Sequence, residues 1–493
     1  MNRVGVFLLL IWASAHLGIP ASFLHAVPPQ FEPPKPLNFV VPKAKHFELS
    51  NKAGVYFLED QELPQIQLTI MLPIGSIYDP ADKAGLSSLF ASVLPYGGTK
   101  KTSADVLTKE LELMGSSIRA GASEESFSIN LFCLSKNFSK TLELLSQIVR
   151  EPMMDAGKLE TEKKKLIAAI HRRNDEPRQI VNREFRRMIY GPDSPWGRRI
   201  EIRTIQNVSR RDLMDYQRKY LMPNHAIVTV SGAISEADLI ARLEAALGRN
   251  VWAQGAWDAP EVKDADISGP ERTVYLVAKT ATEQSAIRLG HYGVERHHPD
   301  YFKLKVLDEL LGGGFSSRLF RNVRSRKGLA YGVWSNFSTP RVKGLLMAGV
   351  GTKSETTVEA IEEVLKEIQM FKQYPVTQEE LLIAKSQIIY SFLQNFRASH
   401  QIAEQVGQLE LLGYPRDYLD TYTANIDKVT AQDILSMATH YWSPEKAVIL
   451  VVGNPKKFDR DLSTLGPVKI LDAESGQVSE PPKNAQGSKS AGQ

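Results

Sequence analysis

Two hydrogen-bond donors, Arg324 and Tyr331, lie seven positions apart in a stretch from Gly312 to Tyr331 that joins a glycine turn, Ser-Ser-Arg-Leu-Phe and Gly-Leu-Ala-Tyr. A guanidinium donates forked hydrogen bonds to carbonyl oxygens, and a phenol donates one well-directed bond. Arg324 is expected near a helix end, and Tyr331 at the start of a strand after Gly328. An alternative stays open, in which Arg324 makes a structural ion pair and Tyr331 packs within its strand.

The glycines Gly312 to Gly314 are weaker evidence for a ligand site. A phosphate-binding loop needs a strand before the glycines and Lys-Ser or Lys-Thr after them, and neither is present. Glycines also end helices, because they adopt backbone conformations that other residues avoid. A helix-ending turn is the interpretation that the sequence favours here.

Metal ligands are scarce in this chain. None of the ten histidines lies between Phe47 and Ile170. His297 and His298 are adjacent, so their side chains point to different faces of a helix or strand. His400 and Glu404 have helical spacing, but that pattern is common on solvated helix faces. We therefore expect no metal site built from these histidines.

The composition is that of an ordinary globular protein. The chain has 493 residues, 43% of them hydrophobic and 24% charged, which is enough for two to four domains. The formal net charge is only +4, and no long basic run carries interleaved aromatic residues. Nucleic acid is therefore not the expected partner.

Both ends of the chain differ from its body. Residues 1–26 resemble an export signal, because the apolar run from Val4 to Ala15 is too short to span a bilayer. An uncleaved anchor is the alternative; after cleavage we expect no stable membrane span and a periplasmic or otherwise exported protein. Residues 27–43 are proline-rich and predict an extended connector, and residues 473–493 predict a disordered tail. The only cysteine, Cys133, can form no intramolecular disulfide and is expected in the core.

The chain contains an internal repeat. Ser209-Arg-Arg-Asp-Leu-Met-Asp-Tyr and the Tyr220 to Gly232 segment are echoed by Thr430-Ala-Gln-Asp-Ile-Leu-Ser-Met and the Tyr441 to Gly453 segment. Asp212 and Asp433, Tyr220 and Tyr441, and Gly232 and Gly453 are each 221 positions apart. Three equal offsets indicate a duplicated domain.

Each copy has the same predicted order of strands and helices. Strands are expected at 54–59 and 65–72 in the first copy, and at 273–278 and 284–291 in the second. One long helical pattern runs from Ala156 to about Ile189. The mixture without strict β-α alternation predicts an α+β fold of two homologous α/β sandwich domains, each a mainly antiparallel sheet with helices on one face. The domains are expected at 44–249 and 272–472, joined by a polar linker at 250–271.

The chain resembles the pitrilysin/insulinase family of zinc peptidases, in its bacterial, processing-peptidase-like branch, over about residues 40 to 470. The local matches are Gly75-Ser76, Ala84-Gly-Leu, Gly98-Thr-Lys-Lys-Thr-Ser103 and, as the most specific, Gly312 to Tyr331. The resemblance implies two homologous α+β halves and two such units clamped around a chamber.

The zinc site that the resemblance implies is missing. In the family, a helix after Gly-Leu carries His-x-x-Glu-His, whose histidines bind zinc and whose glutamate activates water. The matching positions here are Ser88, Ala91 and Ser92. The third ligand, a glutamate on a later helix, falls on Ala169, or on Ala168 if the register shifts by one. Alanine offers no ligand, and serine is a poor one for zinc.

The resemblance also gives Arg324 and Tyr331 a role, that of holding the substrate backbone, with the tyrosine hydroxyl near the developing oxyanion. The leading hypothesis is an exported, zinc-less subunit that is inactive alone and supplies this pair to a zinc-bearing homologous partner in a heterodimer or larger assembly. Zinc is expected on that partner and not on this chain, and unfolded peptides are the expected substrates. The alternative is a non-catalytic peptide-binding or assembly protein of the same fold. An independently active peptidase would need a metal site that the sequence does not contain.

Overall fold

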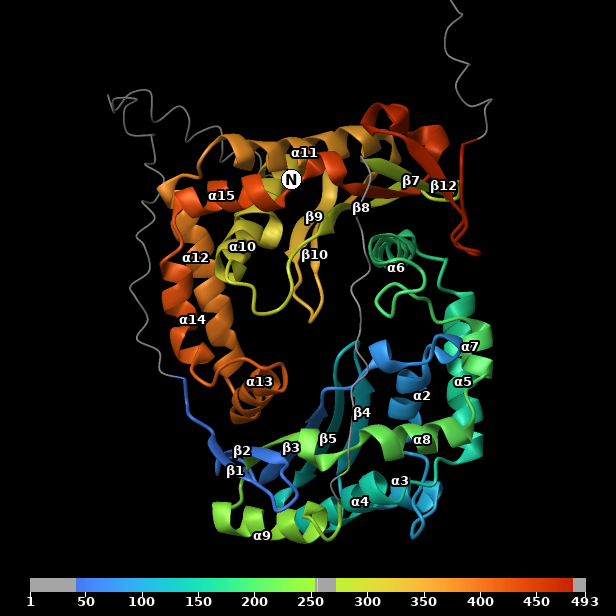
Figure 1. The fold of residues 1–493 in the computed structure, drawn as a ribbon, viewed down its shortest axis with the longest axis vertical. Coiled ribbons are helices and arrows are strands. Elements are labelled where there is room, and N and C mark those ends of the chain that lie inside the picture. Colours follow the sequence, from blue (N-terminus) through green and yellow to red (C-terminus); the bar gives the residue numbers. More distant parts are fainter. Residues whose placement is uncertain (1–40, 253–254, 256–271, 482–493) are drawn as a thin grey trace, which may run out of the picture. The chain divides into compact units, whose positions relative to one another are not determined.

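Two mixed β-sheets organise the protein (Figure 1). The computed structural model describes residues 41–252, 255 and 272–481, all of which belong to one unit that extends from Phe39 to Gln493. The predicted signal at 1–26 and nearly all of the predicted connector lie outside the described residues. Within the described ranges, no helix is long and apolar enough to cross a bilayer.

The first sheet has the strand order β1-β2-β6-β3-β5-β4, and only the pair β2–β6 is parallel. Its strands are β1 (Lys45–Glu48), β2 (Gly54–Glu59), β3 (Gln65–Leu72), β4 (Ser117–Ala122), β5 (Phe127–Leu134) and β6 (Ile227–Gly232). Its helices are α2 (Leu86–Val93), α3 (Ala104–Leu113), α4 (Phe138–Arg150), α5 (Ala156–His171), α6 (Pro177–Tyr190), α7 (Ile202–Gln206), α8 (Arg210–Tyr220) and α9 (Glu236–Leu247).

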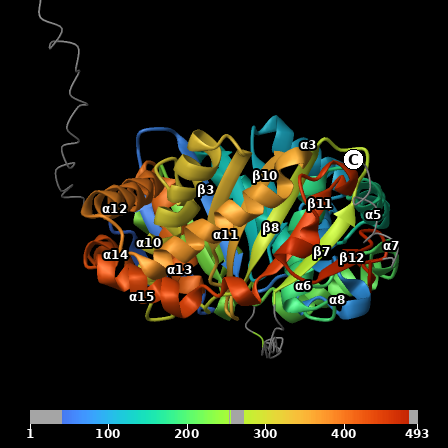
Figure 2. The same cartoon turned by 90° about the horizontal axis from the view of Figure 1, so that it is seen from above.

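The second sheet has the order β13-β12-β7-β11-β8-β10-β9, with β7 parallel to both β12 and β11. Its strands are β7 (Thr273–Ala278), β8 (Gln284–Tyr292), β9 (Ala330–Phe337), β10 (Leu345–Lys353), β11 (Val448–Gly453), β12 (Val468–Leu471) and β13 (Val478–Ser479). Its helices are α10 (Tyr301–Asp308), α11 (Thr357–Gln373), α12 (Gln378–Leu393), α13 (Ser399–Leu411), α14 (Tyr418–Asp427) and α15 (Ala431–Tyr441), with π-helical segments η6 (Glu309–Gly313) and η7 (Phe320–Arg326). Helix α11 packs on β10 and α15 (Figure 2).

The duplication predicted from the sequence is confirmed. Strand β6 lies between β2 and β3, and β11 lies between β7 and β8 in the same directions. Helices α8 and α15 begin with the same capping box, Ser209 with Asp212 and Thr430 with Asp433. In each box, the hydroxyl accepts from the backbone N–H of the aspartate and the carboxylate accepts from the cap backbone, which satisfies two donors that a helix start leaves unpaired. The predicted α+β class is therefore correct for both halves.

Two predictions about the first half need correction. The long helical pattern from Ala156 to about Ile189 is two helices, because Pro177 has no N–H to continue α5 and instead occupies the first position of α6. Trp252, inside the predicted linker at 250–271, is packed against the first half: it is 5% exposed and its indole donates to Leu221 O at 2.8 Å. Residues 253–254 and 256–271 lie outside the described part of the chain.

One helix of each half packs against the sheet of the other half. Helix α6 of the first half packs on β8 and β11, while α13 of the second half packs on β2, β3 and β6. Leu450 and Val452 of β11 accordingly join the core of the first half, and Ile449 and Val451 join that of the second. Each sheet therefore has helices of its own half on one face, and a helix of the other half covers the middle of its opposite face.

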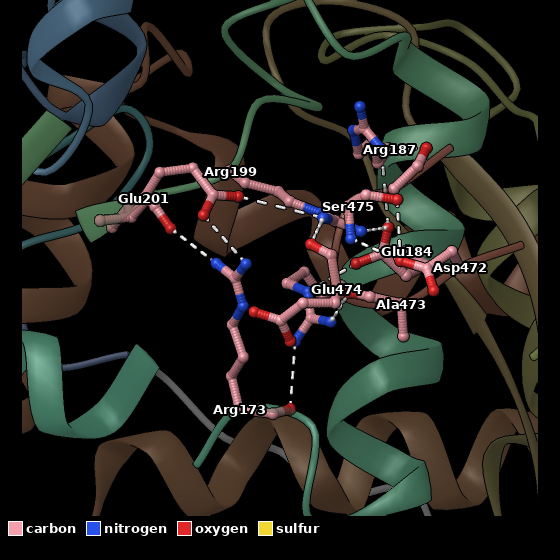
Figure 3. Close-up of polar contacts among 12 residues, drawn as sticks. Arg173, Glu184, Arg187, Arg199, Glu201, Asp472, Ala473, Glu474 and Ser475 are labelled. Carbon is pink, nitrogen blue, oxygen red and sulfur yellow. Dashed lines mark hydrogen bonds and ion pairs between the residues drawn. The ribbon is translucent and has the colours of Figure 1, made fainter. Parts of the chain in front are cut away.

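The beginning of the predicted tail is part of the structure, contrary to the composition-based prediction for 473–493. Residues 472–476 form a turn before β13, and their carbonyl oxygens accept hydrogen bonds from arginines of the first half (Figure 3). Arg187 donates to Gly476 O at 3.0 Å, and Arg199 donates to Glu474 O at 3.1 Å. Because backbone carbonyls and not apolar side chains make these contacts, composition could not reveal them. Residues 482–493 lie outside the described residues.

Candidate functional site

Helix α2, where the resemblance implies a zinc motif, starts from a tightly fixed turn. Gly85 has φ +101°, which favours glycine, and the buried carboxylate of Asp79 accepts from the backbone N–H groups of Gly85 at 2.9 Å and Ser87 at 3.0 Å. Burial raises the pKa of Asp79 to about 6, although these hydrogen bonds lower it. The start of the helix is therefore well formed, whatever residues it carries.

The predicted motif positions offer no metal ligands. Ala91 is 5% exposed among core residues, and Ser92 Oγ donates to Ser88 O at 3.0 Å, one turn earlier. Ala169 is exposed on α5, and α5 packs against α2, so the two predicted ligand helices do meet. In the parts of the chain that the structure describes, no group of three or more His, Cys, Asp or Glu side chains is placed to hold a metal. These residues do not fit a zinc ion.

His400 and Glu404 do not form the solvated pair that their spacing suggested. Helix α13 carries them against the first sheet, where Glu404 Oε1 lies 3.2 Å from His400 Nε2 and accepts from Thr69 Oγ1 at 2.9 Å. The hydrogen bond from His400 is the largest cause that lowers the pKa of Glu404. This pair therefore links the two halves through β3.

Arg324 lies in the π-helical segment η7 with its side chain exposed. Its guanidinium carbon is 4.7 Å from the ring centroid of Phe320, one turn earlier, and no ion pair holds it among the described residues. The ion pairs nearby belong to Arg318, just before this segment, and to Arg321 within it; both bind Glu380 and lower its pKa to about 2. The structural ion pair considered for Arg324 is thus not observed, and its N–H groups are available.

Tyr331 lies on β9, the edge strand of the second sheet, and is 54% exposed. The register with β10 pairs Gly332 with Gly351 and Ala330 with Thr352, so Tyr331 is the extra residue of a β-bulge. A bulge redirects the side chain that it carries and often occurs beside functional sites. This exposure contradicts the alternative in which Tyr331 is packed within the sheet.

The glycine turn before this pair has a packing role. Helix α10 continues into η6, which ends at Gly313, and Gly314 is extended. A Cβ atom on Gly312 would collide with the backbone of Ser335 on β9. The turn therefore ends a helix, as expected, and permits close packing against the strand that carries Tyr331.

The structure places the two sets of predicted residues in separate halves. Helix α2 contacts α5, α8 and β4 of the first half, whereas η7 and β9 contact each other and other elements of the second half. Sequence reasoning missed that Phe320 supports Arg324, although the spacing of four in a helical segment was a signal. It also missed the bulge at Tyr331, for which the sequence carries no clear signal.

Comparisons with protein families give two matches. The family model described as Insulinase (Peptidase family M16) matches residues 55–193, and the model described as Peptidase M16 inactive domain matches residues 207–388. The chain is 25% identical over 410 residues to the uncharacterized zinc protease YmxG of Bacillus subtilis, covering 83% of this chain and 98% of that one. It is 26% identical over 419 residues to the non-peptidase homolog YmxG of Helicobacter pylori, covering 84% and 94%.

Solved structures share the fold. A peptidase M16 inactive domain from Pseudomonas fluorescens superposes with a TM-score of 0.76 at 22% identity, covering 84% of this chain and 98% of that one. A chain of complex III2 from Candida albicans superposes with a TM-score of 0.68 at 17% identity, covering 86% and 98%. At such identities the likeness concerns the fold alone.

Proposed function

Because the chain belongs to the insulinase family of peptidases, M16, and lacks that family's zinc motif, we propose that it is the non-zinc subunit of a two-chain peptidase. A homologous partner with an intact His-x-x-Glu-His supplies zinc and the general base. This chain supplies Arg324 and Tyr331, which hold the backbone of an unfolded peptide. The chain alone has no hydrolytic activity.

The observation that carries the proposal is the contrast between the two halves. Arg324 and Tyr331 are exposed donors without a hydrogen-bonding partner among the described residues, and Tyr331 lies at a bulge on an unpaired sheet edge. An extended peptide can add to such an edge through main-chain hydrogen bonds, alongside the strand that carries Tyr331. The positions on α2 and α5, by contrast, hold no ligand or base.

Export is a separate part of the proposal. It rests on the apolar run near the N-terminus, which lies outside the described residues. A cleaved signal would place the protein in the periplasm or another exported location. Expression with a periplasmic reporter fused after residue 40 tests this: reporter activity supports export, and its absence argues against it.

One comparison favours a second candidate function, that of a non-catalytic peptide-binding or assembly protein. The Helicobacter pylori relative is named a non-peptidase homolog. In this case the chain would bind peptides or partner subunits without contributing to hydrolysis.

Reconstitution with the zinc-bearing homologue from the same organism separates the two candidates. Hydrolysis of a quenched peptide is measured for each chain alone and for the mixture. Arg324→Ala should lower kcat/KM of the mixture roughly 10- to 100-fold, as expected for the loss of hydrogen bonds from a charged donor. Arg326→Ala, two residues later and also exposed, is the matched control and should have little effect.

The outcomes are distinct. A mixture more active than either chain, and sensitive to Arg324→Ala only, supports the shared site. Equal sensitivity to both substitutions would indicate a general charge effect. Peptide binding without any hydrolysis in the mixture would favour the non-catalytic candidate, and zinc-dependent hydrolysis by this chain alone would contradict both.

A further inference from the structure

A second site lies in the helical part of the second half, away from Arg324 and Tyr331. Helices α10, α12 and α14 contact one another there (Figure 1), and with η6 and α13 they enclose a partly open pocket of about 520 Å³. Pockets of several hundred Å³ are typical of small-molecule and side-chain sites. Helix α13 lines this pocket with Gln405, Gln408 and Leu409, and Leu412 follows at its end, whereas Gly407 of the same helix lies against Thr229 and Ile227 of the first sheet.

Aromatic rings form a large part of the pocket lining. They belong to five residues, Tyr301, Phe392, Tyr414, Tyr418 and Tyr422. Their rings support one another: those of Phe392 and Tyr422 stack with centroids 4.2 Å apart, and those of Tyr414 and Tyr418 are 4.5 Å apart. Burial raises the pKa of the Tyr418 and Tyr422 phenols, so both stay neutral at physiological pH. Such a wall favours alkyl chains and organic cations over anions.

Glu309 supplies the one carboxylate that lines this pocket. It lies at the start of η6, is half-buried, and makes no hydrogen bond or ion pair with any described residue. Burial raises the pKa of its carboxyl group, opposed by Lys305 and assisted by Asp308. A desolvated carboxylate without a partner is costly, and a bound cation would offset that cost.

The glycine turn places this carboxylate. A Cβ atom on Gly313 would lie 2.6 Å from Glu309 Oε2, and one on Gly314 would lie 2.8 Å from Glu309 Oε1. Side chains at these positions would displace the carboxylate from its present place. The same turn that packs against β9 through Gly312 therefore leaves room for Glu309 at the pocket.

Lys305 is the only other charged residue of the lining, one helical turn before Glu309. The two do not pair, although their spacing would allow it. Lys305 has the same sign as a cationic ligand and would weaken its binding. It consequently provides a test of ligand charge that is independent of Glu309.

We propose that this pocket binds the side chain of a basic amino acid, with the ammonium or guanidinium group at Glu309 and the alkyl chain against the tyrosine rings. The amide side chains of Asn395, Gln405 and Gln408 offer acceptors for the remaining N–H groups. Lysine and arginine share this chemistry, and the experiment below separates them. The proposal does not depend on a peptidase role for the chain.

Binding of blocked amino acids to the full chain tests the proposal by isothermal titration or ligand-observed NMR. N-acetyl-lysine and N-acetyl-arginine N-methylamides are the probes, N-acetyl-norleucine N-methylamide is the neutral match, and the glutamate derivative is the anionic one. At least one basic probe should bind at least tenfold more tightly than the norleucine derivative. Equal binding of the norleucine derivative, or tighter binding of the glutamate derivative, would overturn the proposal, as would no binding of either basic probe.

Two substitutions should act in opposite directions. Glu309→Gln should lower the affinity for the basic probe at least tenfold, and Lys305→Met should raise that affinity a few-fold. Glu379 is an exposed carboxylate of α12 outside the lining, so Glu379→Gln should leave the affinity unchanged. Affinity should also fall as pH drops through the raised pKa of Glu309. Weaker binding after Lys305→Met would indicate an anion site and refute the assignment. If Glu309→Gln does not fold, Lys305→Met and the pH series decide.

Discussion

Glu184 of α6 is the buried carboxylate beside the C-terminal turn, and its neutralisation should destabilise the protein strongly (Figure 3). Its side chain is 1% exposed, accepts from Arg183 Nε at 2.5 Å and pairs with Arg199, whose side chain is 5% exposed. Glu184→Gln keeps the side-chain shape and removes the charge. Arg199 would then face a neutral amide in place of the buried carboxylate, and its remaining partners are Glu474 O at 3.1 Å and the Glu201 carboxylate at 3.9 Å.

The expected size of the effect follows from the burial of the arginine that is left behind. Removing one partner of a buried ion pair costs about 3–5 kcal/mol, because the other charge stays desolvated. With a urea dependence of about 3 kcal/mol per molar, this lowers the midpoint of unfolding by about 1–1.7 M. Urea is the suitable denaturant, because guanidinium salts screen ion pairs. Far-UV circular dichroism measures the transition.

Two further variants make this prediction refutable. Glu474→Gln changes an exposed carboxylate of the same cluster and should cost about 1 kcal/mol or less. The double variant Glu184→Gln/Arg199→Met removes both buried charges and should recover most of the free energy of unfolding that Glu184→Gln alone loses. An unchanged midpoint for Glu184→Gln, or a double variant as unstable as the two single losses combined, would refute the reasoning.

Three further residues give predictions. Gly407→Ala places a methyl group against buried Thr229 and should lower the free energy of unfolding by about 1–3 kcal/mol in the same urea assay; an unchanged value would contradict the close packing of α13. Burial raises the pKa of the Cys133 thiol to about 12, so iodoacetamide should label it only in unfolded protein, as mass spectrometry would show. Hydrogen bonds from Arg318 lower the pKa of Glu380 from 4.5 to about 2. The ionised Glu380 therefore stabilises the folded protein fully above pH 4.5, and this contribution is lost as the pH falls toward 2. Glu380→Gln should therefore flatten the acid side of the stability profile, and an identical profile would contradict this pairing.

Local patterns predicted the elements of the fold well. Strands β2, β3 and β7 have the bounds expected from alternating or continuous apolar residues, and the repeat indicated that the two halves share the segments that begin α8 and α15. The break between α5 and α6 was also in the sequence, because Pro177 favours a helix start. These features depend on neighbours within a few positions.

Contacts between distant segments could not be predicted in this way. Helix α6 packs on β11, and α13 packs on β6, although the contacting residues are more than 150 positions apart in the sequence. The turn at 472–476 is likewise held by Arg187 of α6 and by Arg199 in the loop before α7. At the candidate site, the residue types of Arg324 and Tyr331 were readable, but the bulge at Tyr331 depends on the register with β10. No local pattern fixes that register.

We propose that Tyr331 donates a hydrogen bond at a zinc site on another chain, and kcat of the reconstituted pair tests this role most directly. Tyr331→Phe removes one hydroxyl, and loss of one oxyanion donor lowers kcat on the order of 100-fold. Zinc content per complex should stay unchanged, and Tyr374→Phe, another exposed tyrosine of the second half, should retain full activity. A Tyr331→Phe complex with full zinc content and wild-type kcat would contradict the account.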